Sequence, residues 1–194
     1  MGTNNNIING FKAVGTLTGA PLNLQQAKFA TLVGDTTPIY PGDALKLVGS
    51  GVDPNGFLTV ARAAAGEVPL VGVMSGVVPD GTDLTAMYRK ASTTTYIYAT
   101  VDPNTIYEAQ ASAAVALADA GKTCSLVSTN GGTAATGLSG MQIDQSTLTT
   151  NTSTFAFKSL GFSQTVGNTP NATYNRLLVK INNHAYASSG VAGV

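Results

Sequence analysis

Residues 44–61 read ALKLVGSGVDPNGFLTVA, and this stretch decides the class of fold that we expect. Apolar, strand-forming residues stand on both sides of a cluster of turn-forming ones. Within that cluster Asp53 can accept hydrogen bonds from the backbone, Pro54 presets φ, and Asn55-Gly56 tolerates a positive φ. The stretch therefore predicts a β-hairpin, with strands at 44–48 and 57–61 and a tight turn at 52–56.

Other parts of the chain have the same strand-forming character. Val, Ile and Thr make up 50 of the 194 residues, and strand-like runs recur at intervals of roughly 8 to 12 residues. We expect further strands at 68–78, 84–89, 96–101, 105–110, 155–160 and 174–181. The one helical pattern is the Ala-rich stretch 113–120, which stops before Gly121. The sequence therefore predicts an all-β fold, a small β-barrel or β-sandwich with one short helix.

Residues 1–40 differ from the rest of the chain, because their apolar residues follow neither the period of a strand nor that of a helix. A tail that is free in water would not need Ile7, Ile8 and Phe11. We therefore expect an extended N-terminal arm over 1–40 that packs on another surface. Residues 41–194 then form the β domain, and the composition allows a subdivision near 110–120.

The charge balance excludes several classes of function. Lys and Arg together number 10, as do Asp and Glu, so there is no broad basic face for nucleic acid. No apolar run reaches the roughly 18 residues that a membrane-spanning helix needs, and the first residues lack the features of a secretory signal. The single cysteine, Cys124, excludes an internal disulfide and a multi-cysteine zinc site. A neutral, charge-poor surface lowers the solubility of a free monomer, which indicates that neighbouring molecules cover the surface of this chain.

No set of residues has the spacing of a catalytic or metal site. His184 is the single histidine, and no Gly-x-Ser-x-Gly motif accompanies it. Cys124 reads as a small buried side chain. Glu108 lies in a strand-like segment and would need a basic partner there, for which the chain offers Arg62, Arg89 or Arg176. We therefore expect no enzyme activity, no cofactor and no metal.

The contact residues that we expect are apolar and aromatic. Tyr96 and Tyr98 share one face of the strand expected at 96–101, as a stacking surface for a sugar or as an oligomer contact. The candidates for contact with a shell or with other copies are Ile7, Ile8, Phe11, Val14, Leu17, Tyr96 and Tyr98.

Seven short segments, in order along nearly the whole chain, form a further pattern. They are NGFKAV at 9–14, GAP at 19–21, PGDALKL at 41–47, VGV at 71–73, DPNTIYEAQ at 102–110, GLSGMQID at 137–144 and LLVKINNHAY at 177–186. Together they resemble a family of small capsid cement (decoration) proteins of tailed double-stranded DNA phages, often found in podophage genomes.

The resemblance implies a structural role in the virion, on the capsid surface. Such a protein binds the outer surface of the shell, cements adjacent capsomers and stabilises the expanded, DNA-filled head. The partners implied are the major capsid protein and other copies of this chain, as a homotrimer rather than a dimer, around a β-barrel, β-tulip or jelly-roll-like core. In this role, deleting residues 1–14 should weaken capsid binding more than folding.

Two other interpretations stay open. Thr-, Ser- and Asn-rich, charge-poor β proteins also occur as fibre or adhesion domains that bind glycans on a host surface. The other interpretation is a small hydrolase that uses His184 or Glu108. Loss of catalytic turnover in His184→Ala or Glu108→Gln would support it.

Overall fold

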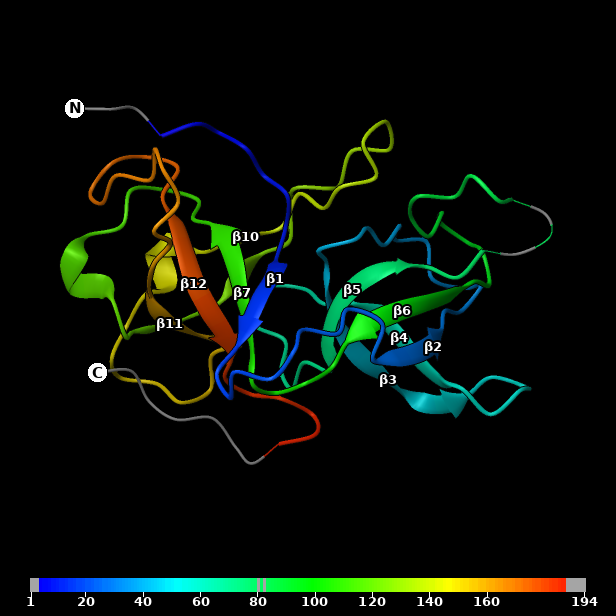
Figure 1. The fold of residues 1–194 in the computed structure, drawn as a ribbon. Coiled ribbons are helices and arrows are strands. Elements are labelled where there is room, and N and C mark those ends of the chain that lie inside the picture. The colour runs from blue at the N-terminus through cyan, green and yellow to red at the C-terminus, as the bar shows by residue number, and fades with distance from the viewer. Residues whose placement is uncertain (1–3, 80, 82, 188–194) are drawn as a thin grey trace.

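The computed structural model describes residues 4–79, 81 and 83–187, and it arranges them as two adjoining β lobes (Figure 1). One lobe is a closed five-stranded barrel, and the other is built on a five-stranded sheet. The all-β prediction is confirmed. Within the described residues the helical content is limited to two 3-10 turns, Leu117–Asp119 and Gln145–Thr147.

The barrel lobe has the strand order β2-β4-β3-β5-β6. Its strands are β2 (Ala27–Ala30), β3 (Ala44–Val52), β4 (Leu58–Arg62), β5 (Gly72–Val77) and β6 (Tyr96–Thr100). All pairs are antiparallel except β2 with β4, which is parallel. The buried apolar residues inside this lobe are Phe29, Ile39, Leu45, Val60, Val71, Met74, Ile97 and Ala99.

The predicted hairpin is β3 and β4, with Leu45 opposite Arg62 and Leu47 opposite Val60. Asp53 Oδ1 accepts hydrogen bonds from the backbone N–H groups of Asn55 (3.1 Å) and Phe57 (2.7 Å). Gly56 has φ +84°, a left-handed backbone conformation that glycine adopts without steric cost. The turn forms for the local reasons that the sequence shows.

The expected strand at 84–89 is reduced to one isolated bridge, between Ile39 and Arg89. Arg89 is fully buried, and its guanidinium donates hydrogen bonds to the carbonyl oxygens of Thr37 (2.7 Å), Thr93 (3.1 Å) and Leu32. A buried cation needs such partners, so the backbone around Arg89 is shaped by its side chain rather than by strand pairing.

The sheet lobe has the strand order β1-β7-β12-β11-β8, entirely antiparallel. Its strands are β1 (Lys12–Thr16), β7 (Thr105–Gln110), β8 (Thr123–Cys124), β11 (Phe157–Phe162) and β12 (Arg176–Ile181). A short pair, β9 (Leu126–Val127) and β10 (Gln142–Ile143), lies beside them. The chain crosses from barrel to sheet at 101–104, ahead of the 110–120 region where the composition allowed a subdivision.

The predicted helix at 113–120 was wrong, apart from the 3-10 turn at its end. Val115 is fully buried, and its backbone N–H donates to Asn175 Oδ1 at 2.9 Å. Ala116 is extended, with φ −75° and ψ 152°. A helix of two turns is marginal by itself, so this anchoring of Val115 outweighs the helix propensity of the alanines.

Residues 4–40 are not a detached arm, because they supply β1 to the sheet and β2 to the barrel. Asn4 donates hydrogen bonds to the carbonyl oxygens of Thr169 (3.1 Å) and Thr173 (2.9 Å), so the segment is fixed ahead of β1 as well. Phe11 is 1% exposed and stacks on Phe157, with ring centroids 4.3 Å apart. Deleting residues 1–14 would therefore remove a core side chain and part of a strand, so we expect this deletion to weaken folding as well as binding.

Candidate functional site

The two lobes meet at a seam that is built around the carboxylate of Asp43. Asp43 is fully buried. Its Oδ2 lies 3.1 Å from Arg62 Nε and accepts a hydrogen bond from the backbone N–H of Tyr40. Its Oδ1 accepts a hydrogen bond from Ser139 Oγ at 2.6 Å. Burial raises the pKa of Asp43, while Arg62, Ser139 and the Tyr40 N–H act in the opposite direction. These partners come from both lobes, so the carboxylate joins them.

A loop from the sheet lobe completes the seam. Residues 128–140 reach toward the barrel (Figure 1), where the carbonyl oxygens of Ser128 and Asn130 accept hydrogen bonds from Arg62 at 2.8 and 2.9 Å. The Ser139 N–H donates to the Pro41 carbonyl at 3.1 Å. Gly10, Gly42 and Ser139 pack so closely that a Cβ at Gly10 would lie 2.5 Å from the Gly42 carbonyl oxygen.

Beside these contacts lies an apolar cleft of about 350 Å³, which we call the seam cleft. It is lined by Asn9, Phe11, Lys12, Ala13, Leu24, Pro41, Gly42, Val73, Met74, Ser75, Thr100, Tyr107 and Leu138. Its walls therefore come from β1 and β7 on one side and from β5 and the end of β6 on the other. A cleft of this size and lining falls within the range of known binding sites.

Exposed apolar side chains recur along the N-terminal segment, which passes over both lobes. We call the following residues the N-terminal strip: Ile7, Val14, Leu17, Leu22, Leu24, Leu32 and Val33. Their exposed fractions range from 36% for Leu22 to 63% for Val33. Leu24 also lines the seam cleft, so the strip and the cleft adjoin at that residue.

The structure separates the N-terminal contact candidates. Ile7, Val14 and Leu17 are exposed, at 45%, 45% and 49%, and Ile8 is half-buried. Phe11 is a core residue and offers no surface contact, because its ring is enclosed against Phe157. The period-free pattern of the segment concealed this difference.

Tyr96 and Tyr98 alternate with the buried Ile97 and Ala99 along β6, as the pattern predicts. The Tyr96 hydroxyl donates to Asp53 Oδ2 at 2.5 Å, and Lys28 Nζ lies 4.1 Å from the centre of its ring. One face of the Tyr96 ring is thus already occupied by a neighbour from β2. The two tyrosines lie on the barrel and do not line the seam cleft.

The groups with chemical reactivity lie apart from one another. His184 is 4% exposed, burial lowers its pKa to about 4, and its Nδ1 accepts the N–H of Tyr186 at 3.1 Å. Cys124 is fully buried, and burial raises its pKa to about 12. Of the three arginines considered as partners for Glu108, the structure selects Arg176, with Nη1 3.8 Å from Oε1. Across residues 4–79, 81 and 83–187, no three His, Cys, Asp or Glu side chains are grouped as a metal ion would require.

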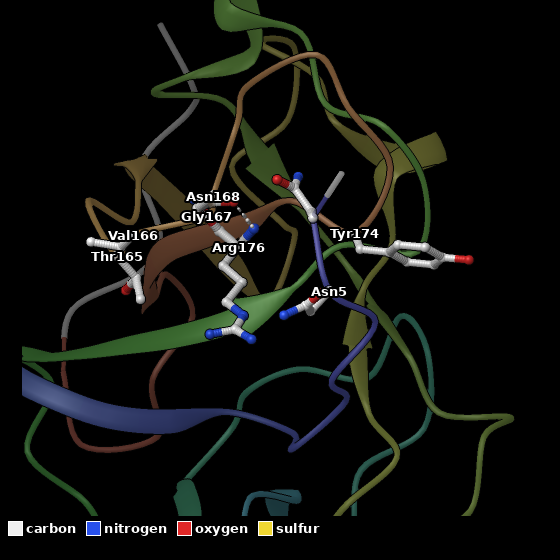
Figure 2. Close-up of a pocket in the computed structure, with 8 residues that line it drawn as sticks. Asn5, Thr165, Val166, Gly167, Asn168, Tyr174 and Arg176 are labelled. Carbon is white, nitrogen blue, oxygen red and sulfur yellow. Dashed lines mark hydrogen bonds between the residues drawn. The ribbon is translucent and has the colours of Figure 1, made fainter. Parts of the chain in front are cut away.

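A second, polar hollow lies where the N-terminal segment meets the loop before β12 (Figure 2). Arg176 and Asn5 reach into it, whereas the ring of Tyr174 points away from Arg176. Asn168 fixes this loop by accepting the Arg176 backbone N–H at 2.9 Å. The hollow measures about 60 Å³, which suits water rather than a larger molecule.

Comparisons with known proteins give no relative: no family model matches the chain, and no curated protein or solved structure matches it. In the part of the chain that the structure describes, no helix is both long enough and apolar enough to span a membrane.

Sequence reasoning missed most of the seam cleft. Ser75, Leu24 and Leu138 come from segments that are distant along the chain, and no local pattern connects them. Lys12 lies in a segment that was expected to be an arm. The signals available were the ordered segments 9–14, 41–47, 71–73 and 137–144, each of which contributes residues to the cleft or the seam.

Proposed function

We propose that the chain is a non-enzymatic virion protein that binds the outer surface of a phage capsid shell and cements adjacent capsomers. The observation that carries this proposal is the N-terminal strip. Its large apolar side chains stand exposed on a segment that is held firmly to both lobes. We propose that these exposed apolar side chains contact another protein.

The chemistry of the surface agrees with this role. The chain has 10 acidic and 10 basic residues, so its contacts would depend only weakly on salt. The resemblance of seven ordered segments to phage cement proteins names the partner, the major capsid protein. A protein that binds only the expanded lattice stabilises that lattice through linkage.

The role also requires several copies around a symmetric shell, and we propose a homotrimer as the binding unit. Its place is the capsid surface of the assembled virion. We keep glycan binding as the alternative interpretation, but the contact between Lys28 and the Tyr96 ring makes the tyrosine face a poorer platform for a sugar.

The test is co-sedimentation of the purified chain with expanded shells that lack it, with the bound copies counted per shell. We expect saturation at a fixed multiple of the number of capsomers or shell subunits. The triple variant Ile7→Ser, Val14→Ser, Leu17→Ser should bind at least about 10-fold more weakly, because it removes apolar contacts from the strip. Val166→Ser is the matched control, since Val166 is fully exposed and lies outside the strip.

Absence of lattice-wide binding, or a few copies at one vertex, would overturn the cement proposal and favour a fibre or tail role. Equal binding by the triple variant and the control would remove the strip from the interface.

A further inference from the structure

After β12 the chain returns from the sheet lobe to the barrel lobe. Ile181, the last residue of β12, belongs to the buried cluster of the sheet lobe, and Ala185 packs against the buried cluster of the barrel. The Leu70 N–H donates to the Asn183 carbonyl oxygen at 2.9 Å, and the Ala185 N–H donates to the Leu70 carbonyl oxygen at 2.7 Å. We call residues 183–187 the C-terminal strap. It connects the two lobes in addition to the contacts of Asp43.

His184 lies within the strap and is buried there in its neutral form. Its side chain is 4% exposed, and its Nδ1 accepts the Tyr186 N–H at 3.1 Å. An imidazole nitrogen that accepts a hydrogen bond carries no proton, so the proton of the neutral ring is on Nε2. Nε2 has no hydrogen-bond partner among the described residues. The closed strap therefore fits one protonation state of the ring.

The protonated ring does not fit the same place. An imidazolium has a proton on both nitrogens, so its Nδ1–H would point at the Tyr186 N–H, and two donors would face each other. Nε2 would hold a second buried N–H that lacks an acceptor in the described part of the chain. Burial of a cation without partners is costly, so the imidazolium gains free energy by moving into water.

The charged groups around His184 do not offset this cost. Asp102, in the segment that crosses between the lobes, favours the protonated ring, but the effect of burial is larger and lowers the pKa of His184 to about 4. Asp102 Oδ1 accepts the Asn104 N–H at 2.8 Å. Glu67, on the approach to Leu70, binds Lys46 and accepts the Ala64 N–H. The titratable group on the strap itself is Tyr186, whose ring centre lies 5.9 Å from that of the imidazole.

We propose that the C-terminal strap is an acid-released latch, which detaches from Leu70 when His184 is protonated while both lobes stay folded. Detachment breaks two backbone hydrogen bonds to Leu70 and the contact of Ala185 with the barrel, whereas the strand pairs of both lobes remain. Openings of this kind need less free energy than unfolding of the whole chain. The inference concerns the fold alone and does not depend on the proposed function.

The size of the effect follows from the two states of the ring. In the open strap the imidazole is in water and has its ordinary pKa of 6.5, whereas burial lowers the pKa to about 4 in the closed strap. The neutral ring therefore favours the closed strap fully above pH 6.5, and this preference is lost as the pH falls toward 4. The ratio of open to closed molecules should rise about 30-fold from pH 8 to pH 5.

Hydrogen exchange of the full chain at pH 8, 6.5 and 5 tests the latch. The Leu70 and Ala185 amides report the strap, and the Ile97 and Val179 amides report the barrel and the sheet. After correction for the intrinsic effect of pH, protection of the two strap amides should fall about 30-fold between pH 8 and pH 5. In low urea their exchange should stay nearly constant, because opening of the strap exposes little surface. Exchange at Ile97 and Val179 should be slower and should rise with urea.

Two variants separate the trigger from the strap. His184→Gln has no group that titrates in this range, so protection of the Leu70 amide should no longer depend on pH. Ala185→Pro removes one of the two backbone hydrogen bonds and leaves the histidine in place. It should lower protection of the Leu70 amide about 5-fold at pH 8, with Ile97 and Val179 still protected. This variant tests the strap even if His184→Gln fails to fold.

Two results would overturn the latch. If the Leu70 and Ala185 amides exchange at the rates of Ile97 and Val179, with the same dependence on urea, the strap opens only when the chain unfolds. If their protection does not change with pH, or changes as much in His184→Gln as in the wild type, then His184 does not control the strap.

Discussion

His184 shows how burial of one side chain makes the stability of the chain depend on pH. Its imidazole is 4% exposed, its Nε2 has no hydrogen-bond partner in the described part of the chain, and burial lowers its pKa from 6.5 to about 4. Because the pKa in the folded state lies below that in the unfolded state, the stabilising contribution is complete above pH 6.5 and is lost as the pH falls toward 4.

We therefore expect the free energy of unfolding to fall by about 2 kcal/mol between pH 8 and pH 5 through this residue. Urea denaturation at pH 8, 6.5 and 5 measures the slope. His184→Gln should remove it, whatever its effect on stability at pH 8. The chain has one histidine, so an unchanged slope in the variant would contradict this assignment.

The roles of single residues could be read from the sequence where chemistry alone decides them. Cys124 was predicted to be a small buried side chain, and its full burial confirms this. Glu108 was predicted to need an arginine, and Arg176 supplies one at 3.8 Å. The sequence could not distinguish Phe11 from Val14, because the burial of Phe11 depends on Phe157, which lies far along the chain.

At the scale of elements, the position of β1 is stabilised by the buried ring of Phe11, which directly precedes the strand, and not by the exposed side chains of the strand itself. Phe11→Ala should lower the free energy of unfolding by about 3–5 kcal/mol, because the ring fills a closed space against Phe157. Leu17→Ala, just beyond β1, should change it by less than about 0.5 kcal/mol, because Leu17 is 49% exposed. Denaturation of the two variants under one condition measures both values. Equal losses would show that Phe11 does not anchor the strand.

The elements that were predicted correctly are those with local causes. The turn at Asp53–Gly56 is made by hydrogen bonds and backbone preferences within a few residues, so the hairpin of β3 and β4 followed from the sequence. The stretch 113–120 failed for the opposite reason. Its alanines favour a helix, but the contact between Val115 and Asn175 comes from 60 residues away along the chain.

At the scale of the whole molecule, the sequence predicts the all-β class but not the two lobes. Closure of the barrel depends on the parallel pairing of β2 with β4, and the sheet depends on β1 pairing with β7. Such pairings join residues that no single periodicity relates. The seam cleft depends on both lobes, so it could not be predicted before the lobes were known.

The Asp43 carboxylate makes the strongest prediction at this scale, because it connects the lobes. Asp43→Asn leaves the buried end of Arg62 without its counter-charge and should lower the free energy of unfolding by about 3–5 kcal/mol. Asp119→Asn is the control. Asp119 forms an ion pair with Lys122, three residues further along the chain in the sheet lobe. Loss of this local ion pair should lower the free energy of unfolding by less than about 1 kcal/mol.

The lobes also share core contacts, since Ala44, Leu70 and Val73 of the barrel side pack in the same cluster as Leu177 and Val179 of the sheet. Loss of the carboxylate should therefore lower the stability of both lobes together. Hydrogen exchange at the amides of Ile97 in β6 and Val179 in β12 reports each lobe separately. Equal losses of protection in Asp43→Asn are expected from one cooperative unit. A loss of protection confined to β6 would mean that the sheet lobe is stable without the seam. The shell could then stay bound to the sheet lobe while the barrel lobe unfolds.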